Sequence, residues 1–294
     1  LALLRLASGA AAAAVITLGL AYVGDIVPYN ERQATLARIL TGQLTGVVFG
    51  QAAGGIIIEY AGWRAAFVVV GAAFALVAAA LWLELRLGQV CQARASEPLR
   101  LGRLIRQYGR IAAAPRSRMI LLAIFAEGFL YFGALAYFGA FLRSAFALDY
   151  LRIGLVLGCF GLGGLCYSLF ARGFVARLGE RGMMRVGGVL LGACLGALAL
   201  LPSWMAVAPV MFVIGFGLYM VHNTLQTNAT QMAPEARGSA VSLFTFVFFI
   251  SQAAGVTALG LAVDRVGYGW VFAAAGAGLF GLLLFFAQKG KGVR

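Results

Sequence analysis

Long apolar runs, separated by short polar or basic stretches, repeat along this sequence of 294 residues. Nine runs have about 20 residues each, the length that a helix needs to cross about 30 Å of hydrocarbon. Because a backbone in lipid must satisfy its own hydrogen bonds, we expect helices rather than strands. The predicted spans are residues 3–24, 38–58, 65–85, 119–142, 151–172, 184–202, 205–226, 239–262 and 269–287. The pattern predicts an all-α, polytopic membrane bundle.

An internal repeat relates the second and third spans to the last two. Residues 46–67 and 251–272 follow the same plan, in the same direction, with offsets of 201 to 207. The matched positions include Gln51 and Gln252, Gly54 and Gly255, Trp63 and Trp270, Phe67 and Phe272, Pro28 and Pro234, and Arg32 and Arg237. Repeats related by an axis along the membrane normal characterise one large transporter architecture. We therefore expect three helices, a linker and six helices, with the last three repeating the first three.

Glycines recur every four residues in the second span, at Gly46, Gly50 and Gly54, with Gly55 beside the last. On a helix this spacing places them on one face. A face without side chains lets another membrane helix approach closely. The spacing predicts that these glycines face a neighbouring helix rather than lipid.

Composition agrees with a membrane protein. The chain is 62% hydrophobic and 11% charged, with a mean hydropathy of +0.93, whereas soluble domains have about 25% charged residues. The net charge of +13 does not indicate a nucleic-acid partner, because the arginines lie between apolar runs rather than on one continuous face. We therefore expect the chain to lie in a lipid bilayer and to bind no nucleic acid.

Lysine and arginine predict the orientation, because these residues gather in cytoplasmic loops. Eighteen of them fall in one set of loops and five in the other, namely Arg5, Arg64, Arg143, Arg152 and Arg265. This asymmetry places the C-terminus in the cytoplasm and residue 1 at the outer face of a multi-pass protein of the cell inner (plasma) membrane.

The longest connection, residues 86–118, is basic and divides the predicted domains. Residues 1–85 would form three helices of an N-terminal bundle, and 119–294 a complete six-helix bundle. Within the linker, Leu101, Leu104, Ile105 and Tyr108 fall on one helical face and arginines surround it. We expect an amphipathic helix at the cytoplasmic lipid surface.

Three motifs resemble the major facilitator superfamily, and its proton-coupled drug and metabolite exporters in particular. Arg5-Leu-Ala-Ser8-Gly9 is similar to R-x-x-Q-G of the family's fourth helix, and Asp25-x-x-Pro28-x-x-x-Arg32 is similar to the loop that follows. Gly46-x-x-x-Gly50-Gln51-x-x-Gly54-Gly55 resembles the antiporter motif G-x-x-x-G-P-x-x-G-G of helix five, with Gln51 in place of proline.

The resemblance implies a twelve-helix, two-bundle fold, of which this chain would be truncated before the fourth helix. It implies that Arg5 is buried and takes part in proton coupling, although a snorkelling arginine at the outer surface has the same pattern. It also implies that Asp25, Pro28 and Arg32, with Pro234 and Arg237 in the repeat, form cytoplasmic gate loops. The antiporter-like motif implies export.

Glu127 is the most informative residue for mechanism. It lies about eight residues inside a span, hence ~12 Å deep. A carboxylate at that depth is costly unless it faces a cavity, is paired or is protonated. We predict that Glu127 faces the central cavity and carries the coupling proton, and that Tyr131, one turn on, shares its face. The alternative is a neutral acid bonded to a hydroxyl or the backbone.

His222 and Asn223 begin a polar run in the inner half of the seventh span. The run predicts either a helix that enters the cytoplasmic gate or a water-exposed helix end. An imidazole exchanges protons near neutral pH and could serve a proton relay.

Metal and cofactor chemistry is not predicted. The four cysteines have no ligand spacing, the single histidine excludes haem held by paired histidines, and the ten acidic residues are scattered. The sequence therefore favours a monomeric secondary transporter that exports a small molecule in exchange for protons. An importer of a sugar or another metabolite is the alternative, and a membrane enzyme or scaffold is disfavoured.

Overall fold

The computed structural model describes residues 3, 7–9, 11, 29–87 and 101–289. The chain divides into two compact units, residues 1–47 with 70–95, and residues 48–69 with 96–294. The first predicted span, 3–24, lies almost entirely outside the described residues.

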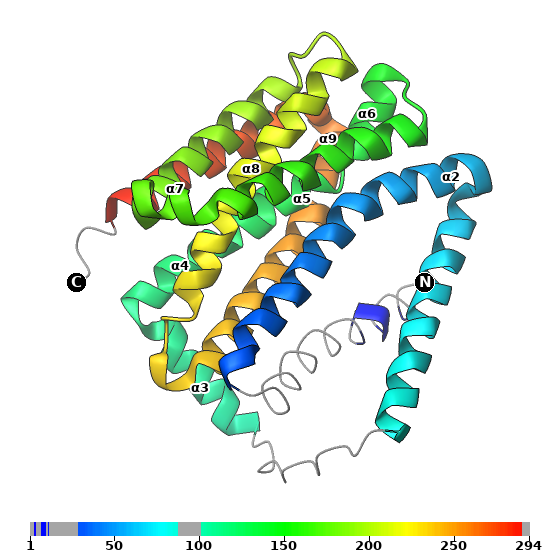
Figure 1. Cartoon of the computed structure of the whole chain (residues 1–294). Coiled ribbons are helices and arrows are strands. Elements are labelled where there is room, and N and C mark those ends of the chain that lie inside the picture. Colours follow the sequence, from blue (N-terminus) through cyan, green and yellow to red (C-terminus); the bar gives the residue numbers. More distant parts are fainter. Residues whose placement is uncertain (1–2, 4–6, 10, 12–28, 88–100, 290–294) are drawn as a thin grey trace. The chain divides into compact units, whose positions relative to one another are not determined.

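The described part of the chain is helical and has no strand (Figure 1). Its elements, in chain order, are α2 (Tyr29–Leu87), α3 (Leu101–Ala113), α4 (Pro115–Ala126), the π-helix η1 (Glu127–Phe132), α5 (Gly133–Leu135), α6 (Phe138–Phe146), α7 (Tyr150–Leu198), α8 (Trp204–Ala229), the 3₁₀-helix η2 (Pro234–Ala236) and α9 (Arg237–Lys289).

Five helical stretches among the described residues are long and apolar enough to cross a membrane. They are Phe49–Glu84, Pro115–Phe146, Tyr150–Leu198, Trp204–Ala229 and Pro234–Phe286. The multi-pass, all-helical fold predicted from the sequence is therefore confirmed. The count differs from nine for two reasons: α2, α7 and α9 each contain two of the predicted spans, and the predicted span 3–24 lies almost entirely outside the described residues.

Single glycines separate the paired spans inside these long helices. The backbone leaves helical geometry at Gly62 (φ 79°, ψ 163°), Gly179 (φ 60°, ψ 175°) and Gly267 (φ 81°, ψ 166°). This combination of angles belongs to a region that is essentially restricted to glycine. Gly62 and Gly267 lie in the two copies of the sequence repeat, and their matching angles support that repeat. The helix is uninterrupted at Gln51, where the antiporter motif has proline.

We expect Gly267→Ala to destabilise the protein by about 1–3 kcal/mol, because alanine must adopt a backbone conformation that its Cβ disfavours. The melting temperature of the purified protein in detergent measures this effect. Gly281→Ala is the matched control in the same helix, since a Cβ there meets no described atom within 4 Å. Equal stability of the two variants would show that the bend at Gly267 does not depend on glycine.

The core of the second unit lies between α8 and the helical arms of α7 and α9, the segments on either side of Gly179 and Gly267. Tyr167, Met183 and Met220 form a buried cluster that joins both arms of α7 to α8. On the other side, Phe138 of α6 contacts Phe272 of α9 edge-on, with ring centroids 5.0 Å apart. Such aromatic pairs add about 0.5–1.5 kcal/mol beyond the area that they bury.

Close glycine contacts bring these helices together. A Cβ added at Gly163 of α7 would overlap the Phe212 carbonyl oxygen, and one at Gly215 of α8 would overlap the Phe160 carbonyl oxygen. The two positions therefore hold the α7–α8 crossing at backbone distance, as small residues do in membrane bundles.

The predicted glycine face of the second span differs in register from the observed contact. A Cβ at Gly46, Gly50 or Gly54 meets no described atom within 4 Å, whereas one at Gly55 would lie 2.9 Å from the Gly154 Cα of α7. Helix α7 thus approaches α2 at Gly55. The prediction that the four-residue stripe faces a neighbouring helix stays a prediction.

Two carboxylates accept hydrogen bonds from backbone N–H groups in the first turn of α7. Glu59 of α2 accepts a hydrogen bond from the Tyr150 backbone nitrogen at 2.8 Å. Asp149 accepts one from the Arg152 nitrogen at 2.7 Å and is the N-cap. Acidic groups are favourable at this end of a helix because its first N–H groups have no partner within the helix.

Candidate functional site

The candidate site is built on η1, the π-helical turn inside the stretch Pro115–Phe146. Gly128 lies within this turn and Gly133 directly follows it. Both face α9: a Cβ at Gly128 would lie 2.8 Å from the Phe248 carbonyl oxygen, and one at Gly133 would lie 2.9 Å from the Gly255 Cα. The two glycines thus let η1 lie directly against α9. π-helical turns within α-helices occur frequently at functional sites.

Glu127, the first residue of η1, pairs with His222 of α8. Its Oε1 atom lies 2.8 Å from the His222 Nδ1 atom, within hydrogen-bonding distance. The glutamate side chain is completely buried, whereas 24% of the histidine side chain is exposed. The structure therefore joins two residues that are 95 positions apart in sequence. The prediction that the Glu127 carboxyl faces the central cavity stays a prediction.

Aromatic rings surround the imidazole. The His222 ring lies 5.5 Å from Phe248, 6.3 Å from Phe132 and 6.4 Å from Phe244, measured between ring centroids. Phe248 and Phe244 come from α9, and Phe132 ends η1. The pair thus lies in an apolar setting, where a net charge is costly and a neutral pair is favoured.

Two buried polar atoms beside the pair have no hydrogen-bond partner among the described residues. They are the second carboxyl oxygen of Glu127, Oε2, and the Tyr131 hydroxyl oxygen. Tyr131 itself is fully buried. Buried polar groups are nearly always paired, and exceptions often mark a working site.

A pocket of about 540 Å³ lies next to the pair along the helices. Ala123, one helical turn before Glu127, and Thr224, two residues after His222, both line it. Polar side chains at the pocket are linked: Asn228 accepts a hydrogen bond from Arg116 at 3.4 Å and donates one to Glu180 at 3.2 Å. Glu127 and His222 themselves do not line this pocket.

Several of the other predicted site residues fall outside the described part of the chain. Arg5, Asp25 and Pro28 lie outside the described residues, and the side chain of Arg32 is not described. Asn223 is half-buried on α8 beside His222. Pro234 starts η2 and Arg237 starts α9, and both are exposed.

Residue type alone did not reveal the aromatic surroundings of His222 or the contacts of Gly128 and Gly133 with α9. Phe132, Phe244 and Phe248 resemble ordinary lipid-facing residues of an apolar run. Gly128 and Gly133 are five positions apart, a spacing that does not suggest one helical face. A π-helical turn contains one extra residue, so the residues that follow it lie on a different helix face from the one that regular α-helical spacing predicts. The sequence did not indicate this turn.

Comparison with known proteins identifies the family. The sequence profile of the Major Facilitator Superfamily matches residues 1–256, and the chain therefore belongs to this superfamily. Members of the family are transporters and not enzymes. The predicted family and the absence of an enzymatic role are thus confirmed, and the protein is a multi-pass membrane protein.

One protein of known sequence and one solved structure are similar to this chain. The "Uncharacterized MFS-type transporter YceJ" of Bacillus subtilis (strain 168) is 26% identical over 259 residues, covering 88% of this chain and 65% of the relative. The chain thus spans slightly less than two thirds of that relative's length. A solved structure, the bacterial homolog to human lysosomal transporter Spinster in an inward-facing and unoccupied conformation, has a TM-score of 0.55 at 19% identity. That match covers 92% of this chain and 71% of the other, and it shows a common fold.

Proposed function

We propose that this protein is a secondary active transporter that exports a small amphipathic molecule in exchange for protons. The observation that carries the proposal is the hydrogen-bonded pair of Glu127 and His222. The pair is enclosed by helices, and the chain belongs to a family of transporters. The pair would be the proton-binding site, with no metal or cofactor involved.

Charge counting explains how the pair would work. A deprotonated Glu127 beside a neutral His222 has a net charge of −1, and one added proton, held on the Glu127 carboxyl, makes the pair neutral. Burial disfavours the charged state, so a closed conformation holds the proton. When helices part and water reaches the carboxyl, for example through the pocket at Ala123 and Thr224, the charged state becomes affordable and the proton can leave.

Coupling follows if substrate and proton favour different conformations, because a ligand shifts an equilibrium only through differential affinity. We propose nine membrane spans in this chain, the paired spans of α2, α7 and α9 being joined at Gly62, Gly179 and Gly267. We further propose a monomer in the inner (plasma) membrane, with its arginine-rich loops in the cytoplasm. The antiporter-like motif at Gly46–Gly55 is the reason for proposing export rather than import.

Transport by the protein in sealed vesicles tests the proposal. Vesicles with an imposed pH gradient are loaded with a panel of amphipathic compounds, sugars and small metabolites, and flux is measured in both directions. We expect export of an amphipathic compound that speeds proton uptake and stops when an ionophore collapses the gradient. Transport that ignores the gradient would contradict proton coupling, and gradient-driven accumulation of a sugar would favour an importer.

A further inference from the structure

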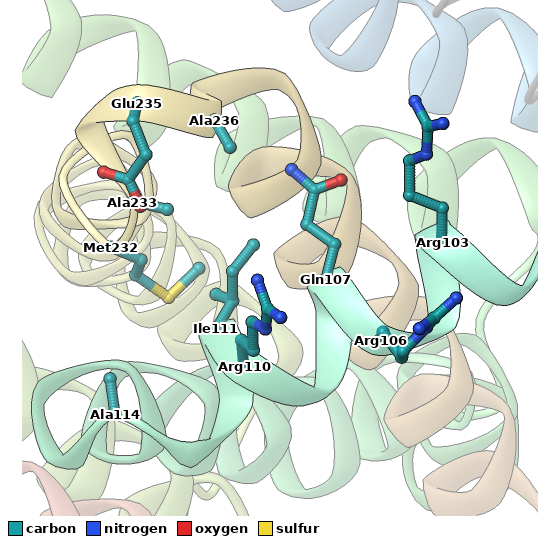
Figure 2. A pocket seen from close by; sticks show the side chains of 10 residues that line it. All are labelled: Arg103, Arg106, Gln107, Arg110, Ile111, Ala114, Met232, Ala233, Glu235 and Ala236. Atoms are coloured by element: carbon teal, nitrogen blue, oxygen red, sulfur yellow. The ribbon is translucent and has the colours of Figure 1, made fainter.

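A second pocket, of about 630 Å³, lies between α3 and the segment that contains η2. Figure 2 shows its lining: the side chains of Gln107 and Ile111 point from α3 toward this segment, and Glu235 lies on the opposite side. The volume is within the range of small-ligand sites. The transport mechanism proposed above does not use this pocket.

Positive charge dominates its polar lining. Arg103, Arg106 and Arg110 all come from α3, against the single acid Glu235. Spacings of three and four residues place the arginines along one side of the helix. Arg106 donates from Nε to the Gly102 carbonyl oxygen at 3.1 Å, a bond that uses one of the five donors of a guanidinium. Arginine donors match phosphate oxygens in geometry as well as in charge.

Apart from Gln107, the remaining lining is apolar. Ile111, Met232 and Ala233 are buried, and Ala114 and Ala236 complete this surface. Basic side chains next to an apolar floor suit an anionic head group attached to a hydrocarbon chain better than a fully hydrated ion. Ile105, on the same helix, is 61% exposed, as expected of a helix that meets lipid.

Helix α3 is also fixed to α9. The hydroxyl groups of Tyr108 and Ser242 lie 3.1 Å apart and share a hydrogen bond. A ligand bridging the arginines of α3 and the η2 segment would add a second connection between the linker and the beginning of α9. It would therefore stabilise this arrangement of the linker.

We propose that this pocket binds the phosphate group of an anionic amphiphile, with an anionic phospholipid as its source. Phospholipid as the source rests on the proposed orientation, because the cytoplasmic leaflet holds the anionic lipids that attract basic segments near the membrane. A soluble phosphate compound has the same binding chemistry, and the experiment separates the two.

Thermal unfolding of the purified protein in neutral detergent measures binding, with phosphatidylglycerol, phosphatidylcholine or inorganic phosphate added. We expect phosphatidylglycerol alone to raise the melting temperature in a saturable manner. The double variant Arg106→Gln/Arg110→Gln should weaken this binding roughly tenfold or more. The control Arg172→Gln/Arg177→Gln removes the same charge from exposed positions on α7 and should bind like the parent.

Glu235→Gln provides a test in the opposite direction. Removing the acid should strengthen phosphatidylglycerol binding about threefold, a result that a misfolded variant cannot imitate. Saturable stabilisation by inorganic phosphate, lost in the pocket variant, would support the phosphate site and assign it to a soluble compound. Equal binding by the pocket variant and the control, or no stabilisation by either phosphate source, would overturn the proposal. Because this assay needs no transport, its failure would leave the proton-coupling proposal untouched.

Discussion

Glu127→Gln is expected to reduce gradient-driven transport about a hundredfold while leaving the protein folded. Glutamine keeps the shape of the side chain and can still hydrogen-bond to the His222 Nδ1 atom, but it cannot exchange a proton. Because glutamine is neutral, the variant avoids the ~2.5–3.5 kcal/mol that a membrane-embedded charge costs on insertion scales. Binding of the transported compound should therefore persist without coupling to the pH gradient.

Two assays on the same vesicles separate coupling from folding. Gradient-driven flux should be lost in Glu127→Gln, whereas exchange of labelled for unlabelled compound at equal pH should continue. Glu127→Asp, which keeps the carboxyl on a shorter side chain, should retain part of the driven flux with an altered pH profile. Undiminished driven flux in the Gln variant would reduce Glu127 to a structural acid.

Gly215→Ala is expected to prevent normal folding, with a loss of about 3 kcal/mol of stability. The added Cβ would overlap the carbonyl oxygen of Phe160 in α7. That oxygen belongs to the backbone, so the overlap is relieved only if α7 and α8 separate, and their contact holds the buried cluster of Tyr167, Met183 and Met220.

The yield of monodisperse protein after mild heating measures the effect on the α7–α8 crossing. Gly196→Ala is the matched control, since a Cβ at Gly196 meets no described atom within 4 Å. We expect the control to match the parent and the Gly215 variant to aggregate. Normal stability of Gly215→Ala would mean that the helices do not cross at backbone distance.

Most of the fold could be predicted because the physics of the bilayer is restrictive. A run of about 20 apolar residues has few alternatives to a spanning helix. The helix breaks were harder to locate. Gly179, for example, lies in a stretch predicted as a loop, yet the structure is helical on both sides of it. One glycine whose φ and ψ angles are disfavoured for other residues is enough to separate the two helical arms. The amino-acid sequence around Gly179 does not indicate that the break is confined to one residue.

The site was predicted residue by residue but not as a pair. Glu127 and His222 attracted attention because titratable groups are rare inside apolar runs. Their contact depends on the rotation of two helices, which the π-turn at Glu127 and the glycine contacts with α9 determine. Sequence periodicity assumes a regular helix, and it therefore could not place the carboxyl against the imidazole.

The protonation state of Glu127 can be observed directly by infrared difference spectroscopy of the purified protein during a pH titration. We predict a carboxylic-acid C=O band that disappears as the pH rises, is absent in Glu127→Gln and titrates differently in His222→Gln. An identical titrating band in the parent and in Glu127→Gln would contradict the central claim that this pair carries the proton.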